Sequence, residues 1–451
     1  TGRNDWSSTL APKNWSYFYP SVAFSMLLDQ MFDFRSNLPA VNMAKLRLSW
    51  ANVGNDTGPY GLDQYYGSSS ISGGFTTPSV IVDPMIKPEN VESWEVGLDA
   101  RLFKNRLGLD VALYTSATTD QIYPLEIDPI VGASTMTINT GEINNKGIEI
   151  ALNGTPVKTN NFTWDLHFNW AKNKNTLVSL HERIDPSQPI ETDMGTTIGG
   201  RLHVYSYVGQ EMHQLYGFAL KRAPEGSYYT DTEGNQVDCS GQVILDATTG
   251  LPSVESTADH FLGKVNPDFR GGFGTSLRYK NLSFSALFSY QVGGHRFSVT
   301  HGILSYQGKL TNSLEGRYDG IVAEGVNVLS TNTDGSAVCQ PNNTVTNSIY
   351  TYYQARVLDR YTGDAHTFET SFLKFREARL EYALPASLVQ RTRVLQGASI
   401  AVFATNIFSL DKWPQFDPEG GMMTGTNVYS GIEAGAYPMT RTMGMNLRLS
   451  F

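Results

Sequence analysis

The sequence predicts an all-β fold, an antiparallel transmembrane β-barrel, from three observations. Apolar and polar residues alternate along segments of about 10–12 residues, close to the roughly 9–11 residues that a tilted strand needs to cross a bilayer core. Connections between these segments alternate between short and long, as they do between the two sides of outer-membrane barrels. Aromatic residues make up 12% of the chain and charged residues 17%, against roughly 25% charged residues in ordinary globular proteins.

Composition excludes several other classes. The low charge and high aromatic content argue against intrinsic disorder. The net charge of −9 argues against a broad nucleic-acid surface, so we expect no nucleic-acid partner. No apolar run reaches the roughly 18 residues of a membrane-spanning helix, which leaves strands as the means of crossing a membrane. We therefore expect the 451 residues to form part of one barrel domain.

The alternation marks about thirteen candidate strands in chain order. They lie near residues 15–27, 42–53, 92–103, 106–117, 145–153, 162–172, 201–209, 213–221, 269–279, 282–292, 372–384, 398–408 and 440–451. The clearest short turn, at 104–106, joins two of them into a hairpin. The first strand of this hairpin places on one face Trp94, Val96, Leu98, Ala100 and Leu102. We expect that face to contact lipid and the opposite face to contact water.

Three details of this pattern need an explanation. Lys374 and Arg376 share parity with the apolar Leu380, which places them either at the lipid interface or beside a β-bulge. The facing of the strand near 398–408 is ambiguous. With an odd number of strands and the last strand ending on the short-turn side, Thr1 would lie in an outer loop. Single-chain bacterial barrels have even numbers of strands. We therefore expect the chain to be an incomplete barrel that an N-terminal remainder of the same protein completes.

A soluble all-β protein is the main alternative fold, with its apolar face packed on a second sheet. Aromatic residues near the segment ends, such as Trp94, Trp164 and Trp170, favour the membrane barrel, because such residues form girdles at lipid interfaces.

Five stretches stand out in chain order: LRLSWANVGN at 46–55, KPENVESWEVG at 87–97, GEINNKGIE at 141–149, NPDFRGGFG at 266–274 with YKN at 279–281, and NIF at 406–408 with DPE at 417–419. In this order they resemble the SusC-like family of TonB-dependent outer-membrane transporters. The chain also ends on an alternating strand that resembles the family's barrel-assembly signal, with Met443, Met445, Leu447, Leu449 and Phe451.

The resemblance implies a 22-stranded barrel in the outer membrane of a Gram-negative bacterium, with long extracellular loops and short periplasmic turns. It also implies an N-terminal plug, contact with TonB through the N-terminal part, and a SusD-like surface lipoprotein as partner. The matched region would be about strands ten to twenty-two, so plug and TonB coupling are implied by the resemblance alone.

The alternation assigns one group of polar side chains to the lumen face: Asp99, Arg101, Glu149, Asp165, His167, Glu377, Arg379 and Glu381. They could line a substrate path, or they could line a hydrated lumen and form salt bridges with the plug. A second group lies in predicted outer loops and carries aromatic rings: Tyr60, Tyr65, Tyr66, Phe75, Trp413, Phe416 and Tyr429. These rings could stack on sugars or contact peptide side chains. Alternatively, they could anchor the loops to each other or to the SusD-like lipoprotein.

No nucleophile, phosphate-loop or metal-ligand motif occurs in the sequence, so we expect no enzyme activity, no cofactor and no metal site. Cys239 and Cys339 both fall in predicted outer loops and could form a disulfide in an oxidising compartment. Acidic turns at 231–235 and 246–250 could hold Ca²⁺, but ordinary turns account for them better.

The resulting hypothesis is active import of nutrient oligomers, with glycan favoured over oligopeptide. A siderophore receptor, a diffusion porin, and a soluble glycan-binding or glycoside-cleaving β-protein remain as alternatives.

Overall fold

The computed structural model describes the whole chain except residues 33, 183, 194–201, 361, 425–426 and 430. Its main element is a 13-stranded sheet in which neighbours along the path pair antiparallel. The strands of this path, in order, are β1 (Gly2–Trp6), β2 (Ser16–Leu27), β3 (Val41–Asn55), β7 (Glu89–Leu102), β8 (Leu107–Glu126), β9 (Thr135–Lys158), β10 (Phe162–Ser179), β17 (Pro267–Tyr279), β18 (Leu282–Gly293), β25 (Phe372–Ala383), β26 (Gly397–Asp411) and β30 (Thr442–Ser450). A short strand, β6 (Val80–Val82), pairs parallel with β9.

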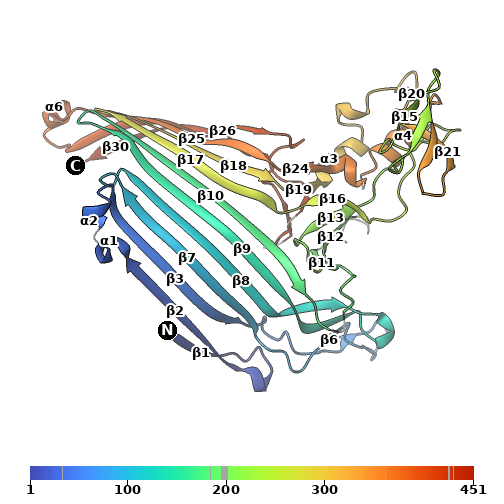
Figure 1. Ribbon diagram of the computed structural model, residues 1–451, viewed down its shortest axis with the longest axis horizontal. Helices are drawn as coiled ribbons and strands as arrows, with labels where there is room; N and C mark the ends of the chain where they lie inside the picture. The colour runs from blue at the N-terminus through green and yellow to red at the C-terminus, as the bar shows by residue number, and fades with distance from the viewer. Residues whose placement is uncertain (33, 183, 194–201, 361, 425–426, 430) are drawn as a thin grey trace.

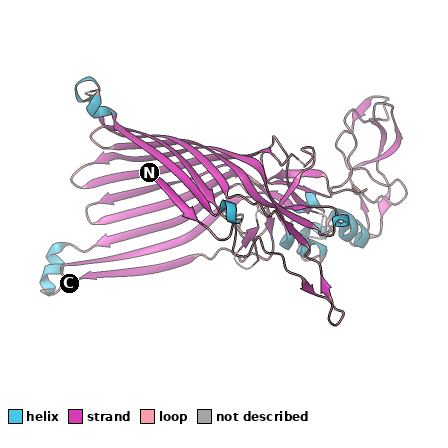
Figure 2. Cartoon of the chain, turned by 90° about the horizontal axis from the view of Figure 1, so that it is seen from below, coloured by secondary structure: helices cyan, strands magenta, loops and turns pink. Residues whose placement is uncertain are grey.

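The sheet curves into an open trough with β1 and β30 at its edges (Figures 1 and 2). Cross-strand register aligns the apolar residues of neighbouring strands on one face. One such row runs through Leu48, Val96, Leu113 and Ile148. A slip of one residue would turn the whole apolar set of a strand to the other face, so this alternation fixes the register.

All but two of the predicted strands belong to this sheet, and the prediction for 201–209 and 213–221 was wrong. These segments form β12 (Leu202–Ser206) and β13 (Gln214–Gly217), which belong to a separate four-stranded sheet. Leu202, Val204 and Leu215 pack on Phe297 and other buried side chains rather than facing lipid. The alternating pattern is the same whether the apolar face meets lipid or another part of the protein, which explains the error.

Two further expectations need correction. A stretch of five residues that the sequence did not mark as a strand forms β1 and pairs with β2. The Thr1 amino group donates to the Ser21 carbonyl at 2.7 Å, so Thr1 lies beside β2 and not in an outer loop. The connection between the candidate strands near 106–117 and 145–153 is mostly strand, because β8 and β9 stay paired as far as Glu126 and Thr135.

A β-bulge in β25 explains the position of its basic residues. Phe375 pairs with Phe288 of β18 and Glu377 pairs with the adjacent Leu287, so Arg376 is the extra residue in the ladder with β18. In the ladder with β26 the extra residue lies on β26, between Thr405 and Phe408. The bulge turns Phe375 to the apolar face, and Lys374 is fully buried against an outer loop. Of the two explanations considered, the structure selects the bulge.

The register also settles the facing of β26. Val402 and Ile400 pair with Met445 and Leu447 of β30 on the apolar face. On the other face, the Phe403 ring covers Gly444, where a Cβ atom would lie 2.6 Å from the ring. Glycine at that position therefore allows the aromatic ring to pack directly on the neighbouring backbone.

Smaller sheets gather at the long-loop end of the trough (Figure 1). Besides β12 and β13 they contain β11 (Ile190–Asp193), β16 (His260–Lys264), β14 (Tyr228–Thr230), β15 (Gln236–Asp238), β21 (Val326–Thr331), β22 (Ala337–Pro341), β19 (His295–Ser298), β24 (Thr367–Glu369), β29 (Ile432–Glu433), β20 (Ile321–Val322), β23 (Val345–Thr346), β27 (Met422–Thr424), β28 (Asn427–Tyr429), β4 (Gly67–Ser68) and β5 (Phe75–Thr76). We call residues 180–266, 294–371 and 412–441 together the outer-loop layer. Its first sheet and β19 share a core of Leu202, Val204, Leu215, Phe297 and Ile432.

Helices are short. They are α1 (Leu28–Met31), α2 (Phe34–Asn37), α3 (Val299–Tyr306), α4 (Ile349–Tyr352), α5 (Gly363–His366) and α6 (Ala386–Val389). None of the helices in the described part of the chain has the length and apolarity to cross a bilayer.

Candidate functional site

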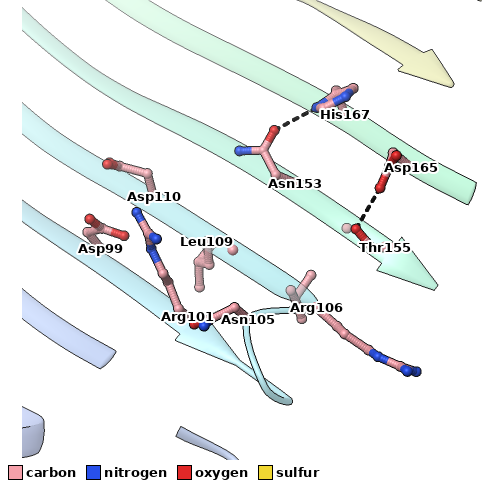
Figure 3. Close-up of a pocket in the computed structure, with 13 residues that line it drawn as sticks. Asp99, Arg101, Asn105, Arg106, Leu109, Asp110, Asn153, Thr155, Asp165 and His167 are labelled. Atoms are coloured by element: carbon pink, nitrogen blue, oxygen red, sulfur yellow. Dashed lines mark hydrogen bonds between the residues drawn. The ribbon is translucent and has the colours of Figure 1, made fainter. Parts of the chain in front are cut away.

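The polar face of the sheet carries a concavity of about 420 Å³ near its short turns (Figure 3). Strands β7 to β10 supply its walls, and the turn at 103–106 supplies its lower edge. Four of the predicted lumen residues meet there, namely Asp99, Arg101, Asp165 and His167. We call this concavity the lumen pocket.

Hydrogen bonds and one ion pair hold the side chains around the lumen pocket. His167 Nδ1 lies 2.8 Å from Asn153 Oδ1, and the Thr155 hydroxyl donates to Asp165 Oδ1 at 2.6 Å. Arg47 forms a bidentate ion pair with Asp110, with N–O distances of 2.8 and 2.9 Å. The Arg101 side chain points toward the carboxyl groups of Asp99 and Asp110 (Figure 3). The result is a surface of mixed charge that suits a hydrated path.

Sequence reasoning did not single out Asp110, Asn153 and Thr155, which also line the lumen pocket. For Asp110 and Asn153 the signal is the cross-strand register, whereas Thr155 lies in the register shift between β9 and β10 and has no such signal. Because the turn at 103–106 pairs Asp99 with Asp110, any polar residue opposite a predicted lumen residue lies on the same face.

The other predicted lumen residues lie elsewhere on this sheet. Glu149 sits on β9, opposite Ala112 and Ala171. Glu377, Arg379 and Glu381 sit on β25; Arg379 pairs with Glu381 at 2.9 Å, and Glu381 also accepts from Ser399 at 2.7 Å. The structure therefore does not bring all eight residues into one site.

A second concavity of about 370 Å³ lies in the outer-loop layer, where β16, β19, α5, β24 and the loop after β26 meet. We call it the outer-loop pocket. Its lining consists of His260, Phe261, Leu262, His295, Asp364, Thr367, Phe368, Glu369 and Lys412. Within the described part of the chain, the buried atoms His295 Nδ1, Asp364 Oδ1 and Thr367 Oγ1 have no hydrogen-bond partner. Native proteins rarely leave such atoms unsatisfied, so these three mark the outer-loop pocket as a candidate polar site.

An ionic cluster fastens the loop after β26 to the wall of the trough. The fully buried ammonium group of Lys374 contacts the carboxylates of Asp417 and Glu419, and Glu419 also pairs with Arg376. Arg296 donates a hydrogen bond to the Pro418 carbonyl at 2.8 Å. Burial of the Arg296 guanidinium lowers its pKa, although the nearby carboxylates act in the opposite direction. The DPE segment at 417–419 thus has a structural role.

Two buried histidines lie side by side in the outer-loop layer. His301 Nδ1 lies 2.9 Å from His366 Nδ1, and His366 Nε2 lies 3.0 Å from the Asp359 carbonyl. Burial, and next the neighbouring His301, lower the pKa of His366 to about 4, and burial also lowers the pKa of His301. Both rings are therefore neutral near pH 7.

The predicted loop aromatics divide into two groups. Tyr60, Tyr65, Tyr66 and Phe75 are at least 67% exposed, and Phe416 is 53% exposed. Trp413 is only 7% exposed and packs edge-on against Phe368. For Trp413 the structure agrees with the anchoring interpretation, because its ring offers no free face for stacking. The backbone of Tyr429 lies in β28, and its side chain lies outside the described residues.

The last strand and the two cysteines complete the predicted sites. Met443, Met445, Leu447, Leu449 and Phe451 are all exposed along the edge strand β30 or at its end.

Cys239 and Cys339 are free thiols buried in one core cluster between β15 and β22. Burial, and next the Cys239 thiol, raise the pKa of Cys339 to about 12. The structure thus brings the two thiols together, and a disulfide between them stays a prediction that alkylation after unfolding without reductant can check.

No group of three or more metal-ligating side chains occurs in the part of the chain that the structure describes. The acidic turns are built as ordinary turns, with Asp231 Oδ1 accepting from the backbone N–H groups of Glu233 and Asn235.

Comparison with known proteins gives consistent results. The family model for the TonB dependent receptor-like β-barrel matches residues 1–258. The whole chain aligns with TonB-dependent receptor P3 of Formosa agariphila at 27% identity and with SusC of Bacteroides thetaiotaomicron at 25% identity, covering 43% and 42% of these relatives. The chain thus spans less than half the length of the curated relatives it matches.

Solved structures show the same fold. The whole chain superimposes on 45% of a chain of the RagAB peptide transporter with a TM-score of 0.71 and 20% sequence identity. At this identity the similarity speaks for the fold and not for the substrate.

Proposed function

This chain belongs to the TonB-dependent receptor-like β-barrel family, and on that premise we propose that it forms part of the wall and outer loops of an active importer of nutrient oligomers. Relatives of this kind are outer-membrane proteins of Gram-negative bacteria, and this chain is a SusC-like member located in that membrane. The observation that carries the proposal is the two-faced sheet: one face is apolar, the other carries the lumen pocket, and the longest loops gather at one end. Such a wall separates hydrocarbon from a wet path.

Energy coupling and partners are part of the proposal. An N-terminal plug would lie against the polar face, TonB would act on that plug, and a SusD-like lipoprotein would cover the outer-loop layer and the exposed loop between β3 and β7. Support comes from the similarity to SusC and from exposed rings such as Tyr60 and Tyr66, which offer apolar contact area beyond the wall.

For the substrate we propose a glycan in preference to an oligopeptide, with the outer-loop pocket as one contact. Asp364 Oδ1 can only accept hydrogen bonds, whereas the Thr367 hydroxyl can donate and accept. Sugar hydroxyls can also do both, so one sugar ring could satisfy these atoms together. Phe261, which is 49% exposed, provides an apolar surface beside them.

The test is binding of oligosaccharide and oligopeptide panels to the full-length transporter with its lipoprotein, measured by calorimetry for wild type and Asp364→Asn. We expect at least one oligosaccharide to bind, and Asp364→Asn to weaken it by roughly tenfold, because the amide replaces one acceptor with a donor.

Asp259→Asn is the matched control, since Asp259 is an exposed carboxylate near β16 that does not line the pocket. Binding of peptides alone would contradict the glycan assignment. Equal losses in the two variants would contradict the role of the outer-loop pocket.

A further inference from the structure

Three lysines occupy the apolar face of the sheet near its outer end. Register places Lys146 opposite Thr115 on one side and Lys174 on the other, and Thr115 lies opposite Trp94. Lys172 lies one row closer to the short turns, opposite Ile148. All three side chains are exposed, and they share their face with Trp94, Leu113 and Ile148 rather than with the lumen pocket.

The height of these lysines corresponds to the edge of the hydrocarbon layer. Along β8 the apolar positions end at Leu113, and Thr115 is the first polar residue on that face. From Leu107 to Thr115 the tilted strand rises by roughly 20 Å, close to the roughly 25 Å of an outer-membrane apolar band. The row of Lys146 and Lys174 therefore lies where acyl chains meet headgroups of the outer leaflet.

The cluster lacks an internal counter-charge. Within the described residues none of the three lysines forms an ion pair, and Lys146 and Lys174 stand directly opposite each other, which is unfavourable for like charges. Glu92 lies on the same face of β7, but its carboxylate accepts hydrogen bonds from the indoles of Trp50 and Trp94, each at 3.0 Å. At the outer end of the neighbouring strands β18, β25 and β26 the same face carries Tyr290, Leu373 and Leu410 instead.

A groove of about 610 Å³ connects these lysines with apolar side chains. Its lining includes Trp94, Val96, Leu113, Ile148 and the three lysines. One end of the groove is cationic and the other is apolar, which matches a lipid with an anionic headgroup. A free anion would gain nothing from the apolar end.

We propose that Lys146, Lys172 and Lys174 bind the phosphate group of a phosphorylated lipid of the outer leaflet, whose acyl chain lies along Trp94, Val96, Leu113 and Ile148. The phosphate offsets the repulsion between Lys146 and Lys174, and the acyl chain covers the exposed apolar surface. Bound lipid then belongs to the wall of the transporter at β7 to β10.

The test uses the full-length transporter, purified and stripped of lipid, with native mass spectrometry to quantify added lipid. The probes are bis-phosphorylated lipid A, the same lipid after removal of its phosphates, and inorganic phosphate. The triple variant Lys146→Gln, Lys172→Gln, Lys174→Gln should bind phosphorylated lipid A about 100-fold more weakly, at roughly fivefold for each lysine. Wild type should bind the dephosphorylated lipid at least about tenfold more weakly.

A matched control removes three positive charges from the opposite end of the wall, at its short turns. Lys104→Gln, Lys158→Gln, Lys280→Gln changes three exposed lysines at the short turns and should leave lipid binding within about twofold. A heat-modifiable gel shift verifies folding of each variant. If the triple variant does not fold, Lys174→Gln alone should still reduce affinity by about fivefold.

Three results would overturn the site: wild-type affinity in the folded triple or single variant, equal binding of the dephosphorylated lipid, or an equal loss in the control. Displacement of the lipid by an equimolar amount of inorganic phosphate would show a free-anion site and refute the lipid assignment.

Discussion

The wall of the trough and the outer-loop layer bury their apolar residues in different ways. On the wall, large apolar side chains remain open, with Trp94 56%, Leu113 51% and Met445 68% exposed. In the outer-loop layer, Phe297, Val204 and Leu215 are completely buried by other parts of the protein. The same alternation of apolar and polar residues therefore serves two surroundings in one chain.

This difference shows where each region obtains its stability. Apolar residues of the wall gain from contact with lipid, and its backbone groups are satisfied by the ladder between strands. The outer-loop layer gains from burial within the protein, as a water-soluble domain does. Substitutions in the two regions should consequently have separable effects.

Phe297→Ala should give the largest effect. The side chain is completely buried in the core of the outer-loop layer, so its truncation should cost about 3–5 kcal/mol. Hydrogen exchange should increase in β12, β13 and β19 while β7 and β8 keep their protection. Phe168→Ala, on the apolar face of β10, is the control and should leave exchange in the outer-loop layer unchanged. Equal loss of protection in wall and layer would mean that the two regions unfold as one unit.

Leu98→Arg should have the next largest effect, on the wall. Leu98 lies on the apolar face midway along β7, where an arginine costs roughly 2–4 kcal/mol near the bilayer midplane. Asp99→Asn changes the adjacent residue on the polar face and should be tolerated. Urea titration of the full-length transporter in lipid vesicles measures both variants. Similar midpoints for the two would contradict the assignment of the faces.

The comparison also explains what could be predicted from the sequence. Strands β7 and β8 were predicted because a short turn and an unbroken period of two specify both their pairing and their facing. The segments near 202–206 and 214–217 have the same period, and no local feature reveals whether Val204 meets lipid or Phe297. That distinction depends on contacts with residues far away in the chain.

The same limit applies to the candidate sites. Alternation predicted that Asp99, Arg101, Asp165 and His167 face the lumen, but their place in one pocket depends on the register between strands, which alternation does not specify. The outer-loop pocket brings together Phe261, Asp364 and Lys412 from three separate segments of the chain. No spacing in the sequence predicts that these segments meet. The bulge at Arg376 shifts parity within one strand and could be suspected only from the charge it would otherwise expose to lipid.

Asp417→Asn tests the junction between wall and layer and should have a smaller effect. Lys374 would keep only Glu419 as a carboxylate partner, and this loss should cost about 1–3 kcal/mol because its ammonium group is fully buried. Hydrogen exchange should increase around residues 412–421 before it increases in β25. Glu233→Gln serves as the control, since Glu233 is an exposed carboxylate of the turn between β14 and β15 and does not line the outer-loop pocket. Unchanged exchange at 412–421 would mean that this ion pair does not hold the loop.

Acidification should give the smallest effect, and only in the outer-loop layer. The folded layer keeps His366 neutral, with its pKa lowered from about 6.5 to about 4, because the ring is buried and lies against His301. The unfolded chain binds a proton in this window and the folded chain does not, so stability is fully present above about pH 6.5 and decreases as the pH falls toward 4. Between about pH 7 and pH 6 the loss should be less than about 1 kcal/mol. Hydrogen exchange of α3 and α5, corrected for the intrinsic pH dependence of exchange, should therefore increase slightly more than exchange of β7. His366→Gln should remove most of this difference, and its persistence in that variant would place the titrating group elsewhere.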